Sequence, residues 1–344
     1  MARGDAHRLI RWLWTSRRPD ARLARLGLLP VSAAWRVAMD LRAMAYQRGW
    51  AGRRELPLPS VAVGNLTVGG SGKTPIASWI ASYYAGIGFK PGILLRGYRG
   101  GDEVLVHEHA VPSAVVIADP DRVAGAERAV AEGAQVLVLD DAYQRLDVWR
   151  DLNLAVVSAE TTRAVRWSLP AGPWREGLHA LERADGLVVT RKRADPASAM
   201  ALARELSGRV RGPVAVVHLL VGWYEGLLTR RRVSAEELRD KRVVAASAIG
   251  DPEAFIAQTK ATGAQVQAAT WGDHHGYRDE DVAWLAKAAR KADYVVMTEK
   301  DAVKLRSRWP ASVPEPLVAL LDLEWEEGHD QLVQALHAVV MRLE

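Results

Sequence analysis

Short apolar runs rich in β-branched residues alternate with helical patterns from residue 60 almost to the end of the chain. Runs of this kind predict buried strands, here at residues 60–63, 92–96, 114–118, 136–140, 154–158 and 187–190. Helices are expected at residues 75–85, 121–131 and 198–206, with start signals such as Thr74-Pro75 and Asp195-Pro196. Strand and helix alternation predicts a mostly parallel sheet covered by helices on both faces.

The pattern restarts after an apolar run at residues 214–223. This second series predicts strands at 243–249, 266–269, 294–298 and 317–323 and helices near 253–262, 279–292 and 330–343. We therefore expect an α/β fold in three parts: an amphipathic helical arm (1–54), a parallel-sheet core (55–214) and a smaller α/β domain (215–344). The last helix could pack back on the core.

The composition is that of a folded protein without thiol chemistry. Apolar residues make up 49% of the 344 residues and charged residues 25%, so extensive disorder is not expected. The chain has no cysteine, which excludes disulfides, thiolate zinc sites and a cysteine nucleophile.

Positive charge is concentrated at the N-terminus. The first 54 residues contain twelve Arg and three Asp, whereas the remaining residues carry 34 basic and 38 acidic side chains. The high pI therefore belongs to one segment, and a general nucleic-acid-binding surface is not expected.

The same segment interleaves Trp and aliphatic residues with arginines, as a helix lying in a bilayer interface does. We expect it to contact an anionic membrane surface; the alternative is a helical arm packed on its own domain. Its longest uncharged run, residues 26–35, is too short to span a bilayer and contains Pro30. No cleavable signal peptide is recognisable.

The strongest chemical signal is a glycine-rich loop between a predicted strand and a predicted helix. Residues 64–75 read Gly-Asn-Leu-Thr-Val-Gly-Gly-Ser-Gly-Lys-Thr-Pro. Backbone N–H groups and the helix N-terminus of such a loop bind nucleotide phosphates, with the lysine on the β and γ phosphates and the threonine hydroxyl on Mg²⁺. The core is therefore expected to be P-loop NTPase-like, with ATP phosphates bound by Thr67, Val68, Gly69, Gly70, Ser71, Gly72, Lys73 and Thr74.

The loop departs from the strict motif at one position, and one alternative interpretation stays open. Thr67 stands where the strict motif has glycine, so it fits only with a negative φ. The alternative is a glycine-rich turn whose lysine has no ligand.

A second strand, whose end carries carboxylates, is expected beside the strand that precedes the loop. Residues 136–139 form an apolar run that ends in Asp140 and Asp141, where the strand's carboxyl end meets the ligand crevice of a parallel sheet. We expect both carboxylates to help hold the metal; the alternative is a turn cap. The residues that follow, and those at 298–301, do not match guanine-nucleotide motifs, so ATP is favoured over GTP.

Eight short strings occur in a fixed order, at residues 64–75, 96–98, 101–103, 119–122, 139–144, 169–176, 273–275 and 298–301. In that order they resemble the tetraacyldisaccharide 4'-kinases, the lipid A 4'-kinases of Gram-negative bacteria, from about residue 25 to residue 305. The resemblance implies transfer of the ATP γ-phosphoryl to the 4'-hydroxyl of a tetraacylated glucosamine disaccharide 1-phosphate. It also implies a peripheral enzyme at the cytoplasmic face of the inner membrane, and a P-loop core joined to a smaller α/β domain.

Carried over residue by residue, the resemblance makes Asp102 the base, paired with His274. A carboxylate in contact with a sugar hydroxyl can orient it and accept its proton during phosphoryl transfer. Without that context, residues 101–103 would be a polar turn and the histidines surface residues or metal ligands. Which of His274 and His275 acts stays open.

The other roles implied concern metal and phosphates. Glu103 joins Thr74, Asp140 and Asp141 as a metal-binding candidate. Arg122, Arg175 and Glu176 are expected to bind the phosphates of ATP or the substrate's 1-phosphate, because arginine suits phosphate geometry; surface ion pairs are the alternative.

The chain departs from the usual family pattern at four positions. Ala142, Tyr143 and Arg145 replace the Gly, Phe and His that follow the aspartate pair, and Val104 replaces a proline. Alanine does not favour a positive φ, so we expect the loop after Asp141 to follow a different path.

Two other functions fit the loop alone. One is a membrane-associated P-loop ATPase that acts as a switch or transport motor without a phosphate acceptor. The other is a kinase of a soluble sugar or cofactor precursor, for which the N-terminal arm would have no use.

Overall fold

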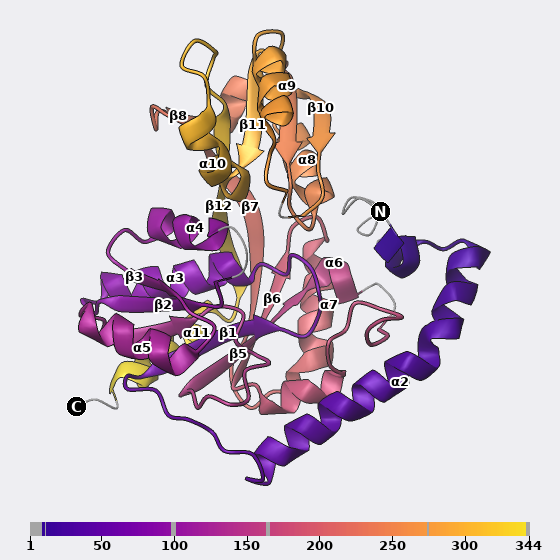
Figure 1. The fold of residues 1–344 in the computed structure, drawn as a ribbon, viewed down its shortest axis with the longest axis vertical. Coiled ribbons are helices and arrows are strands. Elements are labelled where there is room, and N and C mark those ends of the chain that lie inside the picture. The colour runs from indigo at the N-terminus through magenta and orange to yellow at the C-terminus, as the bar shows by residue number, and fades with distance from the viewer. Residues whose placement is uncertain (1–8, 11, 98–100, 163–165, 274, 342–344) are drawn as a thin grey trace. The chain divides into compact units, whose positions relative to one another are not determined.

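The computed structural model describes residues 9–10, 12–97, 101–162, 166–273 and 275–341, and Figure 1 traces their path. The chain forms two compact units. The larger unit contains the described residues up to His218 and those from Trp325 onward, and the smaller one contains Leu219–Glu324. Strands β7 (Val214–Gly226) and β12 (Leu317–Glu327) carry the chain between the units.

The sheet of the larger unit is parallel throughout, as the sequence predicts. Its strands run in the order β7-β6-β5-β1-β4-β2-β3. The bounds are β1 Ser60–Asn65, β2 Pro91–Leu95, β3 Val115–Ala118, β4 Val136–Leu139, β5 Leu152–Ser158 and β6 Gly186–Arg191. Because β1 lies between β5 and β4, the glycine-rich loop after β1 and the two aspartates after β4 leave the sheet at the same edge.

Helices cover this sheet. They are α3 Lys73–Gly86, α4 Asp102–Ala110, α5 Arg122–Ala131, α6 Ala159–Thr162, α7 Pro196–Ser207 and α11 His329–Val340, with a 3₁₀ turn, η1, at Leu178–Arg183. The last helix packs on the larger unit, where the Tyr84 hydroxyl of α3 donates to the Leu336 carbonyl at 2.9 Å. Several helices differ from prediction: α7 begins two residues early, at Pro196, and α6 and α10 (Glu299–Leu305) were not predicted. α3 begins at Lys73 after Gly72, not after Thr74, and α4 was not predicted.

In the smaller unit the strands are again parallel, in the order β10-β9-β11-β12. Its strands are β9 Arg242–Ser247, β10 Gln265–Thr270 and β11 Tyr294–Thr298, and a short β8 (Arg232–Val233) pairs antiparallel with β7. Its helices are α8 Pro252–Ala261, α9 Asp279–Ala289 and α10 Glu299–Leu305, with 3₁₀ turns η2 Ala235–Leu238 and η3 Arg306–Arg308. The second alternating series of the sequence is thereby confirmed.

One face of the long helix α2 (Pro19–Gln47) packs on the larger unit. The Ser32 hydroxyl accepts from the Ala171 N–H at 3.0 Å, and the Trp35 indole N–H donates to the Arg175 carbonyl at 2.9 Å. Arg42 donates to the Gln144 carbonyl at 3.1 Å. These contacts join the helix to the segment 169–176 and to the loop after β4.

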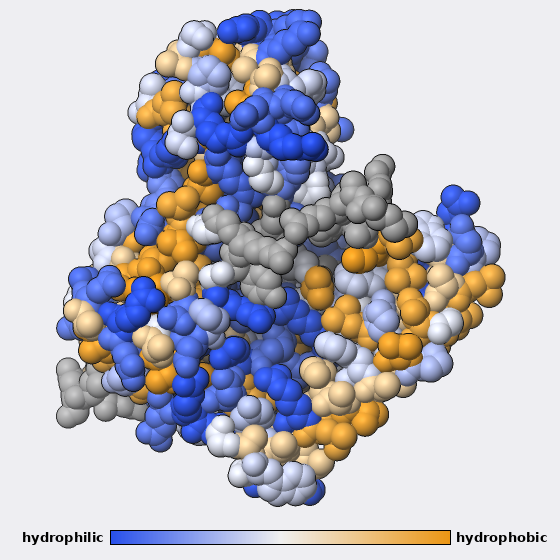
Figure 2. All heavy atoms as spheres, in the orientation of Figure 1, coloured by the Kyte–Doolittle hydropathy of each residue, from blue (hydrophilic) through white to orange (hydrophobic). Residues whose placement is uncertain are grey.

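The opposite face of α2 is apolar and exposed, and Figure 2 shows hydrophobic residues along this helix. Exposed residues without charge recur on this face every three or four positions, so they form one stripe about 27 Å long. We call this the outer stripe of α2: Leu23, Gly27, Pro30, Ala34, Val37 and Leu41. Among the described helices, none combines the length and apolar character needed to cross a bilayer.

A partly buried carboxylate, Glu160 of α6, fixes the loop after β6. It accepts hydrogen bonds from the backbone N–H groups of Lys192, Arg193 and Ala194 at 2.7, 2.8 and 3.0 Å, and from the Ser158 hydroxyl at 2.7 Å. Burial raises the pKa of this carboxyl, but the hydrogen bonds outweigh burial and lower the pKa to about 2. The ionised carboxylate therefore stabilises the loop.

Gly328 connects β12 to α11 at a φ of 73°, and a Cβ there would lie 2.0 Å from the Val214 carbonyl oxygen. We expect Gly328→Ala to lower the free energy of unfolding by about 2–4 kcal/mol, because it adds left-handed strain to a backbone clash. Gly208→Ala is the matched control, since Gly208 has a φ of −68° and open space around its Cβ position. Equal stability of the two variants in denaturant unfolding would contradict the packing described for α11.

Glu160 also predicts a pH dependence of stability. Because its pKa is lower in the folded state than in the unfolded chain, its stabilisation is present above about pH 5 and is lost as the pH falls toward about 2. Glu160→Gln should therefore be less stable than wild type at pH 7 and approach it at low pH. Denaturant unfolding across this range measures the difference, with the exposed Glu132→Gln as control. A constant difference across the range would rule out the carboxylate's role.

Candidate active site

The glycine-rich loop lies against the chain that follows β4. A Cβ on Gly64 would come within 2.5 Å of the Tyr143 backbone nitrogen, so only glycine allows this approach. Inside the loop, the Asn65 side-chain amide donates to the Ser71 hydroxyl oxygen at 2.8 Å. Gly72 takes a left-handed conformation, with a φ of 86°, and turns the loop into α3. The loop backbone is therefore closely constrained.

The residues after β6 hold the other side of the loop. The Thr190 hydroxyl donates to the Ser71 carbonyl at 2.8 Å, and the Lys192 ammonium donates to the Gly70 carbonyl at 2.8 Å. Both donors bind carbonyl oxygens, so these two contacts hold the loop without occupying its N–H groups. Lys192 belongs to the segment that Glu160 fixes, so the carboxylate supports the loop indirectly.

Thr67 fits without glycine because it pairs like a strand residue. It forms an antiparallel bridge with Trp174, next to a hydrogen bond from the Val68 N–H to the Pro173 carbonyl at 2.8 Å. Among the described residues, the non-glycine residues with a positive φ do not include Thr67. The expected negative φ is therefore confirmed, and the segment 169–176 serves as a partner strand for the loop.

The hydroxyl and carboxylates expected to hold a metal lie together. The Thr74 hydroxyl donates to Asp140 Oδ2 at 3.1 Å, and Lys73 Nζ lies 3.6 Å from Asp141 Oδ1. These oxygen donors suit Mg²⁺, which in phosphate sites typically uses one or two carboxylates and completes its shell with phosphate oxygens and water. Among the described residues, no group of three or more His, Asp or Glu side chains could hold a metal ion.

The loop after β4 turns at Asp141 and not at the next residue. Asp141 has a φ of 51°, whereas Ala142 is buried and donates its N–H to the Val63 carbonyl at 3.0 Å. The positive φ that alanine disfavours is thus taken by an aspartate, which tolerates it. Arg145, the other departure in this loop, pairs with Asp147 at 2.9 Å.

The two arginines predicted to bind phosphates occupy different environments. Arg175 lies 3.4 Å from Asp141 Oδ1 and donates to the Gln144 side-chain oxygen at 3.2 Å. Arg122 is buried and donates to the carbonyls of Asp119 and Asp140, at 2.7 and 3.3 Å. Burial lowers the pKa of Arg122 to about 10, which leaves the guanidinium charged at neutral pH beneath the aspartates. A role for either arginine in phosphate binding stays a prediction.

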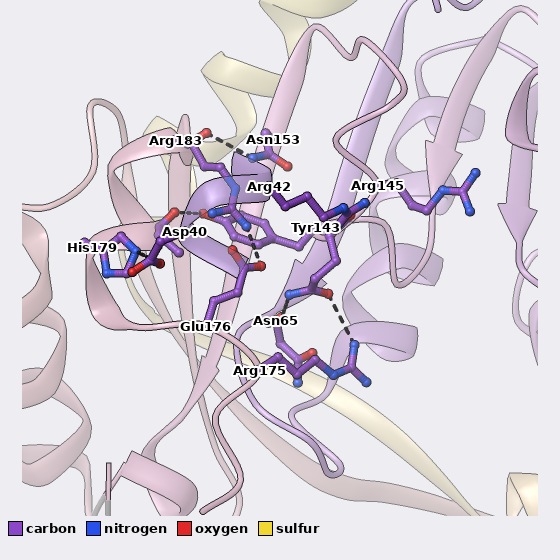
Figure 3. Close-up of polar contacts among 12 residues, drawn as sticks. Asp40, Arg42, Asn65, Tyr143, Arg145, Asn153, Arg175, Glu176, His179 and Arg183 are labelled. Atoms are coloured by element: carbon purple, nitrogen blue, oxygen red, sulfur yellow. Dashed lines mark hydrogen bonds and ion pairs between the residues drawn. The ribbon is translucent and has the colours of Figure 1, made fainter. Parts of the chain in front are cut away.

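Glu176 belongs to a second polar group shown in Figure 3. It is 5% exposed and pairs with Arg183 at 2.6 Å, while the Arg183 guanidinium lies 4.5 Å from the centre of the Tyr143 ring. Next to them, a pocket of about 380 Å³ lies between α2 and η1, with Asp40 and His179 in its lining, 2.7 Å apart. The pocket is thus lined by α2 and by η1, whose Arg183 is the partner of Glu176.

The residues carried over as base and partner are only partly described. Asp102 and Glu103 form the first turn of α4, whereas His274 lies outside the described residues. His275 Nε2 lies 2.8 Å from Asp281 Oδ2, and the ring stacks on Trp271. The Trp271 indole N–H donates to the other oxygen of Asp281 at 2.9 Å, so His275 belongs to a local structural cluster.

Three residues near the site were not predicted from the sequence. His107 is fully buried and bonds to Asp140, and Thr190 and Lys192 contact the loop. The position of Thr190 and Lys192 could have been predicted, because they lie at the carboxyl end of a buried parallel strand, and ligands bind at the carboxyl ends of such strands.

The family model described as tetraacyldisaccharide-1-P 4'-kinase (LpxK) matches residues 24–101 and 99–341. The tetraacyldisaccharide 4'-kinase of Anaeromyxobacter sp. (strain K) is 36% identical over 361 residues, which cover 95% of this chain and 94% of the relative. That of Aromatoleum aromaticum is 36% identical over 313 residues, which cover 86% of this chain and 88% of the relative.

Among solved structures, LpxK from Aquifex aeolicus in complex with ATP has the same fold. Its TM-score is 0.72 at 24% identity, and the match covers 92% of this chain and 99% of that one. Together with the family model and the two relatives, the matches span nearly the whole chain. The chain therefore belongs to the tetraacyldisaccharide-1-P 4'-kinase family that its motifs indicated, and it is a kinase of lipid A biosynthesis.

Proposed function

We propose that this chain transfers the γ-phosphoryl group of ATP to the 4'-hydroxyl of a tetraacylated glucosamine disaccharide 1-phosphate. The observation that carries the proposal is the pairing of Thr74 with Asp140, and of Lys73 with Asp141, in a chain of this family. The alternative of an ATPase without an acceptor is not favoured, because the family is one of kinases. The relative from Aquifex aeolicus was solved with ATP, which supports ATP as the donor.

On the donor side, backbone N–H groups between Thr67 and Thr74 and the N-terminus of α3 bind the ATP phosphates. The N–H groups of Val68 and Ser71 are not among them, since they donate to the carbonyls of Pro173 and Gly69 at 2.8 and 2.9 Å. Lys73 contacts the outer phosphates, where its charge offsets the charge of the transferring group. Thr74, Asp140 and Asp141 would hold Mg²⁺, which supplies positive charge on the β and γ phosphate oxygens. Glu103 is left out of this set, because no three carboxylates among the described residues lie close enough together to hold one ion.

On the acceptor side, Asp102 contacts the 4'-hydroxyl, orients it and accepts its proton as the new bond to phosphorus forms. The imidazole that partners this base would orient the carboxylate and stabilise the transferred proton. We assign that role to His274, since His275 is bonded to Asp281 and stacked on Trp271.

Arg175 binds the acceptor next to the loop, where α2 also contacts its segment. Glu176 is buried and paired with Arg183, so it supports this segment and does not contact the acceptor. Arg175 is the better candidate for a substrate phosphate, because it is half-buried and its present partners are the side chains of Asp141 and Gln144. Arg122 lies below the aspartates, and its charge acts on bound phosphates from there.

The outer stripe of α2 binds the bilayer that contains the acceptor. Its side chains enter the headgroup boundary, and the arginines of the N-terminal segment meet anionic headgroups. This attachment fits a peripheral enzyme at the cytoplasmic face of the inner membrane, where ATP is present.

Two substitutions test the chemistry. Lys73→Ala should lower kcat/KM for 4'-phosphorylation of detergent-dispersed acceptor by about 10²–10³-fold, because a charge aimed at the transferring phosphoryl group is lost.

Asp102→Asn should lower kcat by about 10²–10⁴-fold, because the proton acceptor is lost, and should leave binding of an ATP analogue intact. Mass spectrometry of the lipid product measures both.

Matched controls are Glu108→Gln on the exposed side of α4 and Lys260→Ala on α8. Both should retain wild-type turnover. A wild-type chain that forms no 4'-phosphate overturns the proposed function. Near-normal turnover of Asp102→Asn, with an active wild type, overturns only the assignment of the base.

A third test concerns the membrane. Replacing Leu23, Val37 and Leu41 together by Ser should weaken binding to anionic vesicles by about 10–100-fold, because these side chains are 69%, 56% and 54% exposed on the outer stripe. The control replaces Val130, Leu228 and Leu321, which are exposed elsewhere, by Ser. Equal sedimentation of both triple variants with vesicles would leave α2 as a helix that only packs on its own unit.

A further inference from the structure

His107 is a buried histidine that the proposed chemistry does not use. It lies in the second turn of α4 and is 0% exposed. Its Nδ1 lies 2.8 Å from the Ser78 hydroxyl of α3, and its Nε2 lies 3.2 Å from Asp140 Oδ2. Both ring nitrogens therefore have polar partners inside the larger unit.

The contacts fix which nitrogen carries hydrogen. An ionised carboxylate only accepts, so Nε2 donates to Asp140, and in the neutral ring Nδ1 accepts from the Ser78 hydroxyl. Ser78 lies four residues after Thr74 on α3, so both face the same side of that helix. The ring is thus held in one orientation by α3 and by the end of β4.

Asp140 is the residue that this arrangement orients. Its Oδ2 accepts from Thr74 and from His107, and its Oδ1 accepts from the Asp141 N–H at 2.8 Å. The carboxylate is 3% exposed, so its direction is set by these protein donors. A donor that holds a metal-binding carboxylate fixes its direction and raises its affinity for the ion.

We propose that His107 is a positioning residue that orients the Asp140 carboxylate for the metal of the nucleotide complex through its Nε2–H. The inference rests on the proposed function, because it assumes that Asp140 holds Mg²⁺. A histidine kept only for packing would be replaceable by any side chain that fills the same space. A positioning role predicts a different result, because only a side chain with a donor at the place of Nε2 can still hold Asp140.

Two amide variants separate the ring's contacts. The amide nitrogen of His107→Gln reaches the position of Nε2 and keeps the donor to Asp140, whereas the amide of His107→Asn reaches only Nδ1 and keeps the contact with Ser78. Each variant loses one of the two hydrogen bonds, so both should lower the melting temperature to a similar extent. His109→Gln, on the same helix, is the control.

The measurement is Mn²⁺ binding by electron paramagnetic resonance, with the full chain, a non-hydrolysable ATP analogue and no acceptor. We expect His107→Asn to raise the Kd for Mn²⁺ by about 10–100-fold and His107→Gln to stay within about threefold of wild type. In the kinase assay, His107→Asn should raise the apparent KM for Mg²⁺ more than it lowers kcat.

Equal Mn²⁺ affinity of the Asn and Gln variants, whether both weakened or both normal, overturns the positioning role. In that case 4'-phosphorylation by the wild type still stands. A wild-type chain that binds no Mn²⁺ with the nucleotide analogue overturns the metal assignment of Asp140, and the inference with it.

Discussion

The hydrogen bond between the Thr74 hydroxyl and Asp140 is the interaction on which the site depends. It joins the first turn of α3 to the end of β4, two elements separated by 66 residues. The two meet because β1 and β4 are adjacent and parallel, so their carboxyl ends reach the same edge of the sheet. The pairing of hydroxyl and carboxylate that we propose for metal binding is therefore a product of strand order, and a local change in either loop cannot create it.

The glycine-rich loop is held from both sides, which suits a site that must bind phosphates with backbone groups. Thr190 and Lys192 bind its carbonyls on one side, and the segment 169–176 pairs with its first residues on the other. Fixed N–H groups stabilise negative charge without the cost of reorganising at each turnover. The direction of these N–H groups therefore depends on residues well outside the loop.

The sequence was sufficient for the sheet and for the loop, since both are encoded locally. Apolar runs bounded by turn residues indicated each strand of the core. The strand and helix predicted on either side of residues 64–75 indicated that the loop between them binds phosphates. α4 was missed because its apolar residues show no helical period and only Val106 and His107 are buried. The contact of His107 with Asp140 could not be predicted, because it depends on how α4 packs against α3 and β4.

Two interpretations of the N-terminal arm, packing and membrane contact, proved compatible because a helix has two faces. The inner face of α2 uses Ser32, Trp35 and Arg42 to bind backbone groups of segments 169–176 and 139–144. These polar contacts, with the buried Ala21, attach the helix through its inner face and leave the outer stripe exposed. A helix attached through that stripe would have buried it, so attachment through the inner face is what leaves an apolar surface exposed on a kinase whose acceptor carries acyl chains.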